Sequence, residues 1–220
     1  MVDRLLPARN SRAETSPYGK ATMKILCAPT SPYSSKVRMA ARYLELDAIE
    51  IRVDTNAGPA LLVDNNPLGK IPTLLTDDGL SIFDSVAIMH YFDRLKGKKL
   101  YPSKNGKRTE AEILEALCDG ICDCLLAIVY ERRFRDEEKV HQPWIDRQWK
   151  KAVSGLNHLS VHLPNIGRRL HGGHFALAAT LGYLDLRFEG QWETDHSELI
   201  GWRREFEKKF AAYNELKPQT

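Results

Sequence analysis

Three short motifs in the first half of the chain carry the residues best suited to chemistry. They are Thr-Ser-Pro-Tyr at residues 30–33, Gly-Lys-Ile-Pro at 69–72 and Phe-Asp-Ser at 83–85. The first offers hydroxyl groups, the second an exposed backbone edge beside a proline, and the third an acid at a helix start. Since they fall at a strand end, before a strand and at a helix start, they can together surround a small peptide-like thiol.

The hydrophobic pattern around these motifs predicts a small sheet with helices. Short apolar or alternating runs predict strands at 24–28, 49–53, 73–75 and 80–83. Apolar residues that recur every three or four positions predict helices from Ser34, at 60–63 and around 88–95. The last two strands flank Asp-Asp-Gly, which is typical of a hairpin turn. The order β-α-β-α-β-β-α is that of a thioredoxin-like domain, over residues 23–96.

The rest of the chain is helical in its pattern. A stretch rich in Lys, Gly and Pro predicts a linker at 97–107, followed by an all-helical domain at 108–220. Thr109 and Glu112 form a capping-box pattern, which places the start of the first long helix at Thr109. Residues 175–186 are apolar nearly all round and predict a buried central helix. Residues 1–22 lack an apolar stripe and are expected to be a non-native or disordered extension.

From Met23 to the C-terminus, this order of motifs resembles glutathione S-transferases, especially bacterial sequences with an early Thr-Ser-Pro-Tyr. The resemblance implies a thioredoxin-like α/β domain plus an all-α C-terminal domain, in a cytoplasmic homodimer. It implies a detoxification enzyme without a cofactor, which conjugates the thiolate of its co-substrate glutathione to a small, apolar electrophile. Two alternatives stay open: a glutathione-dependent reductase or peroxidase, and a non-catalytic protein that binds glutathione or a protein partner.

The resemblance assigns thiol activation to one of two neighbouring hydroxyls. A free thiol has a pKa of about 8.5, so a thiolate near neutral pH must be stabilised. A hydroxyl that donates to sulfur, together with the positive end of the helix that starts at Pro32, can stabilise it. Some transferase classes use the residue two before the proline, here Thr30, and others the residue immediately before it, here Ser31. Ser31 is preferred and Thr30 is the alternative, and either also suits the helix N-cap.

The second motif is expected to hold the middle of glutathione. In transferases the proline that corresponds to Pro72 follows a cis peptide bond, which turns the backbone N–H and C=O of Ile71 toward the cysteinyl part. Lys70 is expected to meet the glycyl carboxylate, with ordinary solvation as the alternative. Tyr33, from the first motif, either lines the thiol pocket or packs against the fold.

Acidic residues and a serine are expected at the γ-glutamyl end of glutathione and beside the second substrate. Asp84 and Ser85 open a helix, so the helix N–H group and the Ser85 hydroxyl suit the γ-glutamyl carboxylate, and Asp84 suits its ammonium. The alternative is that Asp84 and Ser85 only cap the helix, because a purely structural N-cap would have the same sequence. Asp119 and Asp123, four residues apart on the first long helix, are expected to border the cleft and meet the second substrate, unless that face is exposed.

No metal is expected. Cys118, Cys122 and Cys124 do not share one helix face, and His171 and His174 are too few for a metal site. Relatives usually carry Ser or Thr as the cap of the buried helix and Asp three residues later. The two histidines occupy these positions, so the cap is expected to be weaker by roughly 1 kcal/mol.

Composition excludes several other classes. The net charge of +3 among 28% charged residues is near balance, so no nucleic-acid partner is expected. No apolar run reaches the length of about 18 residues that a membrane span needs. Four cysteines in 220 residues are too few for a disulfide scaffold, which favours a reducing cytosol.

Overall fold

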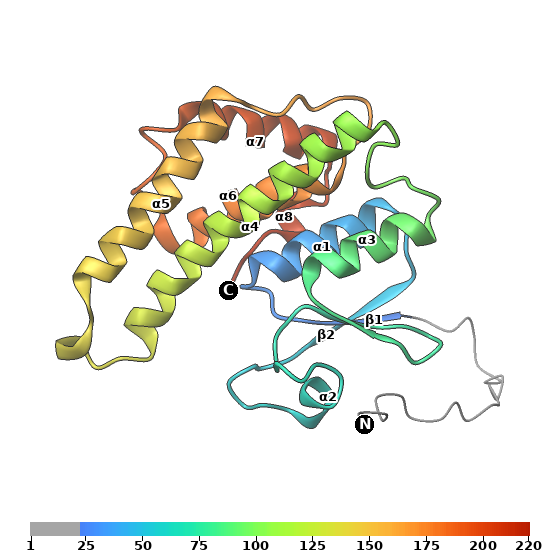
Figure 1. Ribbon diagram of the computed structural model, residues 1–220, viewed down its shortest axis with the longest axis horizontal. Coiled ribbons are helices and arrows are strands. Elements are labelled where there is room, and N and C mark those ends of the chain that lie inside the picture. The colour runs from blue at the N-terminus through green and yellow to red at the C-terminus, as the bar shows by residue number, and fades with distance from the viewer. Residues whose placement is uncertain (1–22) are drawn as a thin grey trace, which may run out of the picture.

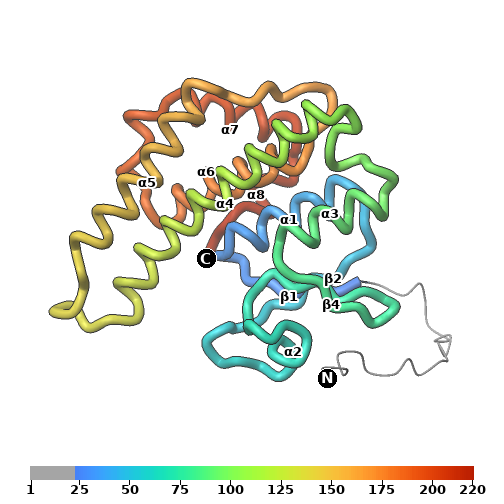
Figure 2. Tube along the Cα trace, viewed as in Figure 1, coloured from blue at the N-terminus to red at the C-terminus, as the bar shows by residue number. Residues whose placement is uncertain are grey.

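The computed structural model of the protein describes residues 23–220. The extension predicted at residues 1–22 lies outside the described residues. Figures 1 and 2 show a small sheet with its helices beside a larger set of helices, as the sequence predicted. The thioredoxin-like domain and the helical domain are therefore both confirmed as regions of the fold.

The sheet contains four short strands in the order β2-β1-β3-β4. Their bounds are Met23–Cys27 for β1, Ala48–Arg52 for β2, Thr73–Leu75 for β3 and Ser81–Ile82 for β4. β1 pairs in parallel with β2 and antiparallel with β3, which in turn pairs antiparallel with β4. β1 is central because its apolar side chains are buried on both faces, whereas β4 is a short edge strand.

Two helices cover one face of this sheet. They are α1, Pro32–Tyr43, and α3, Ser85–Leu95, and they lie side by side in Figure 1 with the short α2, Ala60–Val63, beyond the opposite face. Both helices bury an apolar stripe against the sheet, with Val37, Ile88 and Phe92 completely buried. Because α1 and α3 begin at the same edge of the sheet, their N-termini face the same region of the molecule.

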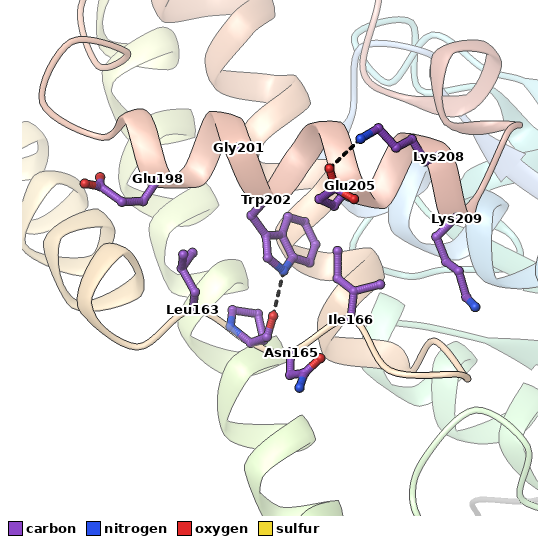
Figure 3. Close-up of a pocket in the computed structure, with 10 residues that line it drawn as sticks. Leu163, Asn165, Ile166, Glu198, Gly201, Trp202, Glu205, Lys208 and Lys209 are labelled. Atoms are coloured by element: carbon purple, nitrogen blue, oxygen red, sulfur yellow. Dashed lines mark hydrogen bonds and ion pairs between the residues drawn. The ribbon is translucent and has the colours of Figure 1, made fainter.

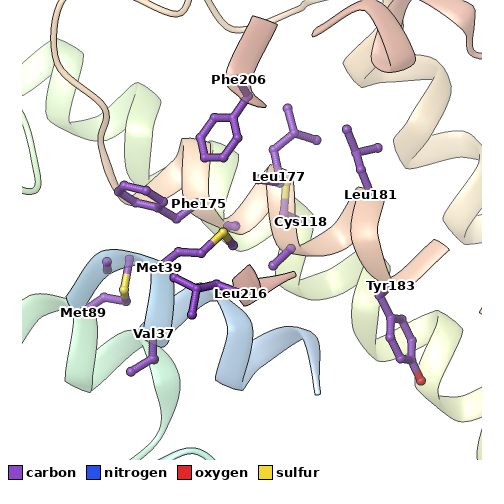
Figure 4. Close-up of a cluster of buried hydrophobic side chains, with 14 of the residues drawn as sticks. Val37, Met39, Met89, Cys118, Phe175, Leu177, Leu181, Tyr183, Phe206 and Leu216 are labelled. Carbon is purple, nitrogen blue, oxygen red and sulfur yellow. The ribbon is translucent and has the colours of Figure 1, made fainter. Parts of the chain in front are cut away.

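The helical region is built around one buried helix. It contains α4 at Asn105–Arg133, α5 at Gln142–Val161, α6 at Gly172–Phe188, α7 at Ser197–Lys209 and α8 at Tyr213–Leu216, with a single 3₁₀ turn at Glu137–Lys139. α6 is buried along almost its whole length, which confirms the prediction for residues 175–186. In Figure 4, Met39 of α1 meets Phe175 of α6 and Leu216 of α8 in one core. This shared core joins the two regions.

The predicted start of the first long helix was wrong. α4 begins at Asn105, four residues before Thr109, and no side chain caps it. The Thr109 hydroxyl instead donates to the Asn105 carbonyl at 3.0 Å, inside the helix. Arg108 explains the earlier start, because its guanidinium pairs with the buried Asp93 of α3 at 3.1 Å and so holds the first turn in place. The linker is correspondingly shorter than the predicted 97–107.

Two histidines stand at the start of α6. His171 is the N-cap, and the Nδ1 atom of His174 accepts the His171 backbone N–H at 3.2 Å. The rings stack with centroids 3.6 Å apart. Burial lowers the pKa of His171 to about 4 and that of His174 to about 3, so both rings are neutral at physiological pH.

Candidate functional site

A cavity of about 610 Å³ lies where the N-termini of α1 and α3 face α4 and α6. It brings together residues far apart in the sequence, from the sheet region and from the helical region. All of the residues predicted for the site line it: Thr30, Ser31, Tyr33, Lys70, Ile71, Pro72, Asp84, Ser85, Asp119 and Asp123. The structure therefore gathers the three motifs and both acids around one space.

The first motif places two hydroxyls at the positive end of α1. Ser31 is the N-cap, and its Oγ accepts the Ser34 backbone N–H at 3.2 Å, which confirms its capping role. Accepting this bond leaves the hydroxyl proton of Ser31 available to a ligand. Thr30 lines the same wall, and its side chain forms no hydrogen bond within residues 23–220. Both hydroxyls thus stay candidates for contact with sulfur.

The second motif forms an extended edge beside the cavity. The Ile71–Pro72 peptide bond is cis, as predicted for Pro72. The loop before it is organised by Asn66, whose buried amide donates to the Lys70 carbonyl at 2.8 Å and to the Thr73 hydroxyl at 3.2 Å. The sequence marks Asn66 as part of the break before Pro67, but no role in the site was predicted for it. Lys70 is exposed at the rim of the cavity.

The third motif opens α3. One carboxylate oxygen of Asp84 accepts the Val86 backbone N–H at 3.1 Å, so Asp84 is the N-cap of this helix. The carboxylate is exposed, and its second oxygen is free to accept from a cationic group. Ser85 is almost fully buried beside it. Capping and ligand contact are therefore compatible in this pair.

Asp119 and Asp123 line the cavity from α4, but both are engaged by residues of α1. The buried ammonium of Lys36 lies 2.6 Å from an oxygen of Asp119 and 3.0 Å from the buried Glu115. Burial, partly offset by Lys36, raises the pKa of Asp119 to about 6. The Tyr33 hydroxyl donates to Asp123. Tyr33 therefore both lines the cavity and ties α1 to α4.

Six residues of the wall that α4 and α6 form were not predicted for the site: Ala116, Leu126, Tyr130, Arg133, Tyr183 and Arg187. A signal for the α4 residues existed, because Asp119, Asp123, Leu126, Tyr130 and Arg133 recur at helical spacing on one face. No comparable signal pointed to α6, because that helix is buried on most sides. Only the packing of α6 beside α4 brings its last turn to the cavity.

A second hollow, of about 730 Å³, lies on α7 and the segment before α6, far from these motifs in the sequence. Figure 3 shows Trp202 in it, with the indole N–H donating to the Pro164 carbonyl at 2.8 Å. Lys208 is paired with Glu205 at 2.6 Å. The hollow is wide and presents no nucleophile, so the cavity between the two regions is the better candidate site.

Neither a metal centre nor a membrane segment is found in the described part of the chain. Within residues 23–220, no three His, Cys, Asp or Glu side chains are grouped so that they could hold a metal ion. Over the same residues, no helix combines the length and apolar composition that crossing a bilayer requires.

Comparison with known proteins agrees with this geometry. The family model for the N-terminal domain of glutathione S-transferase matches residues 30–95, which contain all three motifs. A glutathione S-transferase from Methylobacillus flagellatus KT, solved with GSH bound, is 31% identical with a TM-score of 0.83. The match covers 90% of this chain and 100% of that chain. The chain belongs to the glutathione S-transferase family.

Further relatives in this family are similar along most of their length. A glutathione S-transferase from Methylobacterium radiotolerans JCM 2831, solved with glutathione sulfonate, is 28% identical with a TM-score of 0.82, covering 90% of this chain and 96% of that one. The uncharacterized GST-like protein YibF of Escherichia coli K12 is 27% identical over 186 residues, which are 81% of this chain and 90% of YibF. The family and its fold are thus shown.

Proposed function

We propose that the protein binds glutathione in the cavity and conjugates its thiolate to a small electrophile held against α4 and α6. The single observation that carries this proposal is that the cavity joins all three motifs of the sheet region to one wall of the helical region. Support also comes from the two relatives that were solved with glutathione or glutathione sulfonate.

Each motif has one part of glutathione to hold. The backbone N–H and C=O of Ile71 form no hydrogen bond within residues 23–220, so they are free to pair with the cysteinyl unit, as an added strand would. The N-terminus of α3 and Ser85 suit the γ-glutamyl carboxylate, and the free oxygen of Asp84 suits the ammonium. Lys70 at the rim suits the glycyl carboxylate. The sulfur then lies toward the start of α1.

The start of α1 suits thiolate formation. A hydroxyl that donates to sulfur, Ser31 in preference to Thr30, and the positive end of α1 both favour the charged form. The thiolate then attacks the electrophile, a carbon–sulfur bond forms, and the leaving group departs with the bonding pair. Leu126, Tyr130 and Ala116 offer an apolar surface for the body of that electrophile.

We further propose a cytoplasmic homodimer that acts in detoxification. All four cysteines are free, which suits a reducing compartment. Leu68, beside the second motif, is 67% exposed, and Ile113 on α4 is 61% exposed. Because these apolar side chains are so exposed, their burial in an interface with a second copy of the chain would be favourable.

The test of the function combines binding with turnover. Calorimetry should show that glutathione binds, and absorbance should show that chlorodinitrobenzene is conjugated faster than in the uncatalysed reaction. Binding without turnover on this substrate or other electrophiles would instead favour the non-catalytic binder. Reduction of disulfides or peroxides without a stable conjugate would favour the reductase or peroxidase.

A further inference from the structure

The cavity wall that α4 and α6 form carries two arginines that the proposed function does not use. Arg133 stands in the last turn of α4 and Arg187 in the last turn of α6, and both line the cavity. The two helices run in parallel: Gly173 approaches Ala111 near their starts, and the Thr180 hydroxyl donates to the Cys118 carbonyl further along. Their C-terminal ends therefore bring both guanidinium groups to the same end of the cavity.

Neither arginine is neutralised by the protein. Within residues 23–220, neither Arg133 nor Arg187 forms an ion pair, and the buried Nε atom of Arg187 has no hydrogen-bond partner. The neighbouring Arg132 and Arg135 differ, because Arg132 donates to Gln142 and Arg135 pairs with Glu131 at 2.7 Å. The terminal nitrogens of Arg187, on a half-buried side chain that lines the cavity, have no acceptor among the described residues either, so a ligand atom that accepts from them is favoured.

A tyrosine beside the two arginines adds a hydrogen-bond donor. Tyr183 is 2% exposed, lines the cavity, and forms no hydrogen bond through its hydroxyl among the described residues. Figure 4 shows its ring extending away from the core cluster, with the hydroxyl at the far end. Burial raises the pKa of Tyr183 to about 12, so the hydroxyl is a donor at neutral pH.

The acids that line the cavity do not pair with these arginines. Among the described residues, none of Asp84, Asp119 and Asp123 forms an ion pair with Arg133 or Arg187: Asp119 is paired with Lys36, Asp123 accepts from Tyr33, and Asp84 caps α3. Cations in the last turn of a helix also stabilise its dipole, which accounts for the position of each arginine. It does not account for the presence, at one cavity, of two guanidinium groups without an ion pair, one of which lies 5.7 Å from the centroid of the Tyr130 ring, and of a tyrosine hydroxyl without a partner among the described residues.

We propose that the second substrate carries a carboxylate, which Arg133, Arg187 and Tyr183 bind, and that the apolar part next to it bears the reacting carbon. This inference rests on the proposed function and names the substrate class of the same cavity. A guanidinium matches the planar carboxylate with paired donors, and Tyr130 provides a ring for the apolar part. A neutral electrophile would leave the guanidinium of Arg187 in the cavity wall without a counter-charge.

The binding test uses a matched pair of glutathione conjugates, S-(para-carboxybenzyl)glutathione and the corresponding carboxamide. They have nearly the same shape and differ in charge. The protein should bind the carboxylate about tenfold more tightly, or better, which is the scale of a hydrogen bond to a charged group. Equal affinities, or preference for the amide, would overturn the inference, and this measurement needs no variant.

Variants locate the preference. Arg187→Met and Arg133→Met keep most of the side-chain stem but remove the charge, so each should reduce the carboxylate preference, and the double variant should abolish it. Arg132→Met is the matched control, because it removes the same charge from the same turn of α4 outside the cavity. Unchanged affinity for glutathione itself confirms folding. A loss of preference in Arg132→Met equal to that in Arg133→Met would show a general surface-charge effect and overturn the assignment.

Turnover separates this inference from the proposed function. The substrates are two chlorodinitrobenzenes, with a carboxylate or a carboxamide para to chlorine, and each rate is divided by its uncatalysed rate. The thiolate forms a bond to the carbon that carries chlorine, and chloride leaves with the electron pair. Carboxylate-selective binding without turnover would overturn the proposed function and support the carboxylate site. Turnover of both substrates without selectivity would support the proposed function and overturn the carboxylate site.

Discussion

Replacing Ser31 with alanine should raise the thiol pKa of bound glutathione and leave its binding at low pH nearly unchanged. Ser31 caps α1 as an acceptor at 3.2 Å from the Ser34 nitrogen, so its own proton is free to be donated to sulfur. A hydrogen bond to a charged group contributes about 1.5–3 kcal/mol, and about 1.4 kcal/mol corresponds to one pKa unit. The expected rise is therefore about one to two pKa units.

The assay is ultraviolet absorbance of the thiolate against pH at saturating glutathione. Ser31→Gly separates the two roles of the side chain: it also removes the hydroxyl, so the thiol pKa should rise equally. Its thermal stability should fall less, because glycine at an N-cap loses only a few tenths of a kcal/mol against about 1 kcal/mol for alanine. Thr30→Ala is the matched control and should leave the thiol pKa in place.

Two results would refute this reasoning in different ways. A pKa that rises in Thr30→Ala and not in Ser31→Ala would exchange the roles of the two hydroxyls. A pKa that moves in neither variant, with glutathione still bound, would show that no hydroxyl activates the thiol. The non-catalytic binder would then be the better account of the protein.

Four other results are expected. Asp84→Asn should weaken glutathione binding by about 1.5–3 kcal/mol in calorimetry while keeping the cap of α3, and unchanged affinity would exclude contact with the ammonium. Lys36→Met leaves the buried carboxylate of Glu115 and the partly buried carboxylate of Asp119 without their cation, and should lower the free energy of unfolding in urea by about 3–5 kcal/mol. A change near zero would show that the ion pair does not stabilise the fold. His171 and His174 have a pKa of about 4 and about 3 when folded, against 6.5 when unfolded, so the unfolded chain binds more protons below pH 6.5. Stability should be complete above that pH and fall near pH 5 by about 2 kcal/mol for each histidine, about 4 kcal/mol together, and the double variant His171→Ser/His174→Asp should flatten this slope. Light scattering at micromolar concentration should give about twice the chain mass of 25.0 kDa, and a monomer would refute the dimer.

Much of the sheet region follows from local signals. The strand and helix order, the cap at Ser31 and the cis bond before Pro72 were all predicted, and the structure contains them. Each depends on a residue and its near neighbours in the sequence, such as a hydroxyl three residues before the N–H that it accepts from. The start of α4 was predicted wrongly because a long-range ion pair between Arg108 and Asp93 overrides the local capping pattern at Thr109.

The sequence by itself predicted which residues of the sheet region line the site, because each motif carries its geometry in a few adjacent residues. Only the tertiary structure decided what faces them. The contact of Tyr33 with Asp123 spans 90 positions, and the approach of Arg187 to Arg133 depends on how α6 is rotated beside α4. A helix that is apolar on most sides has no amphipathic stripe to fix this rotation. Packing against all of its neighbours at once fixes this rotation, and with it the charge of the cavity wall that α4 and α6 form.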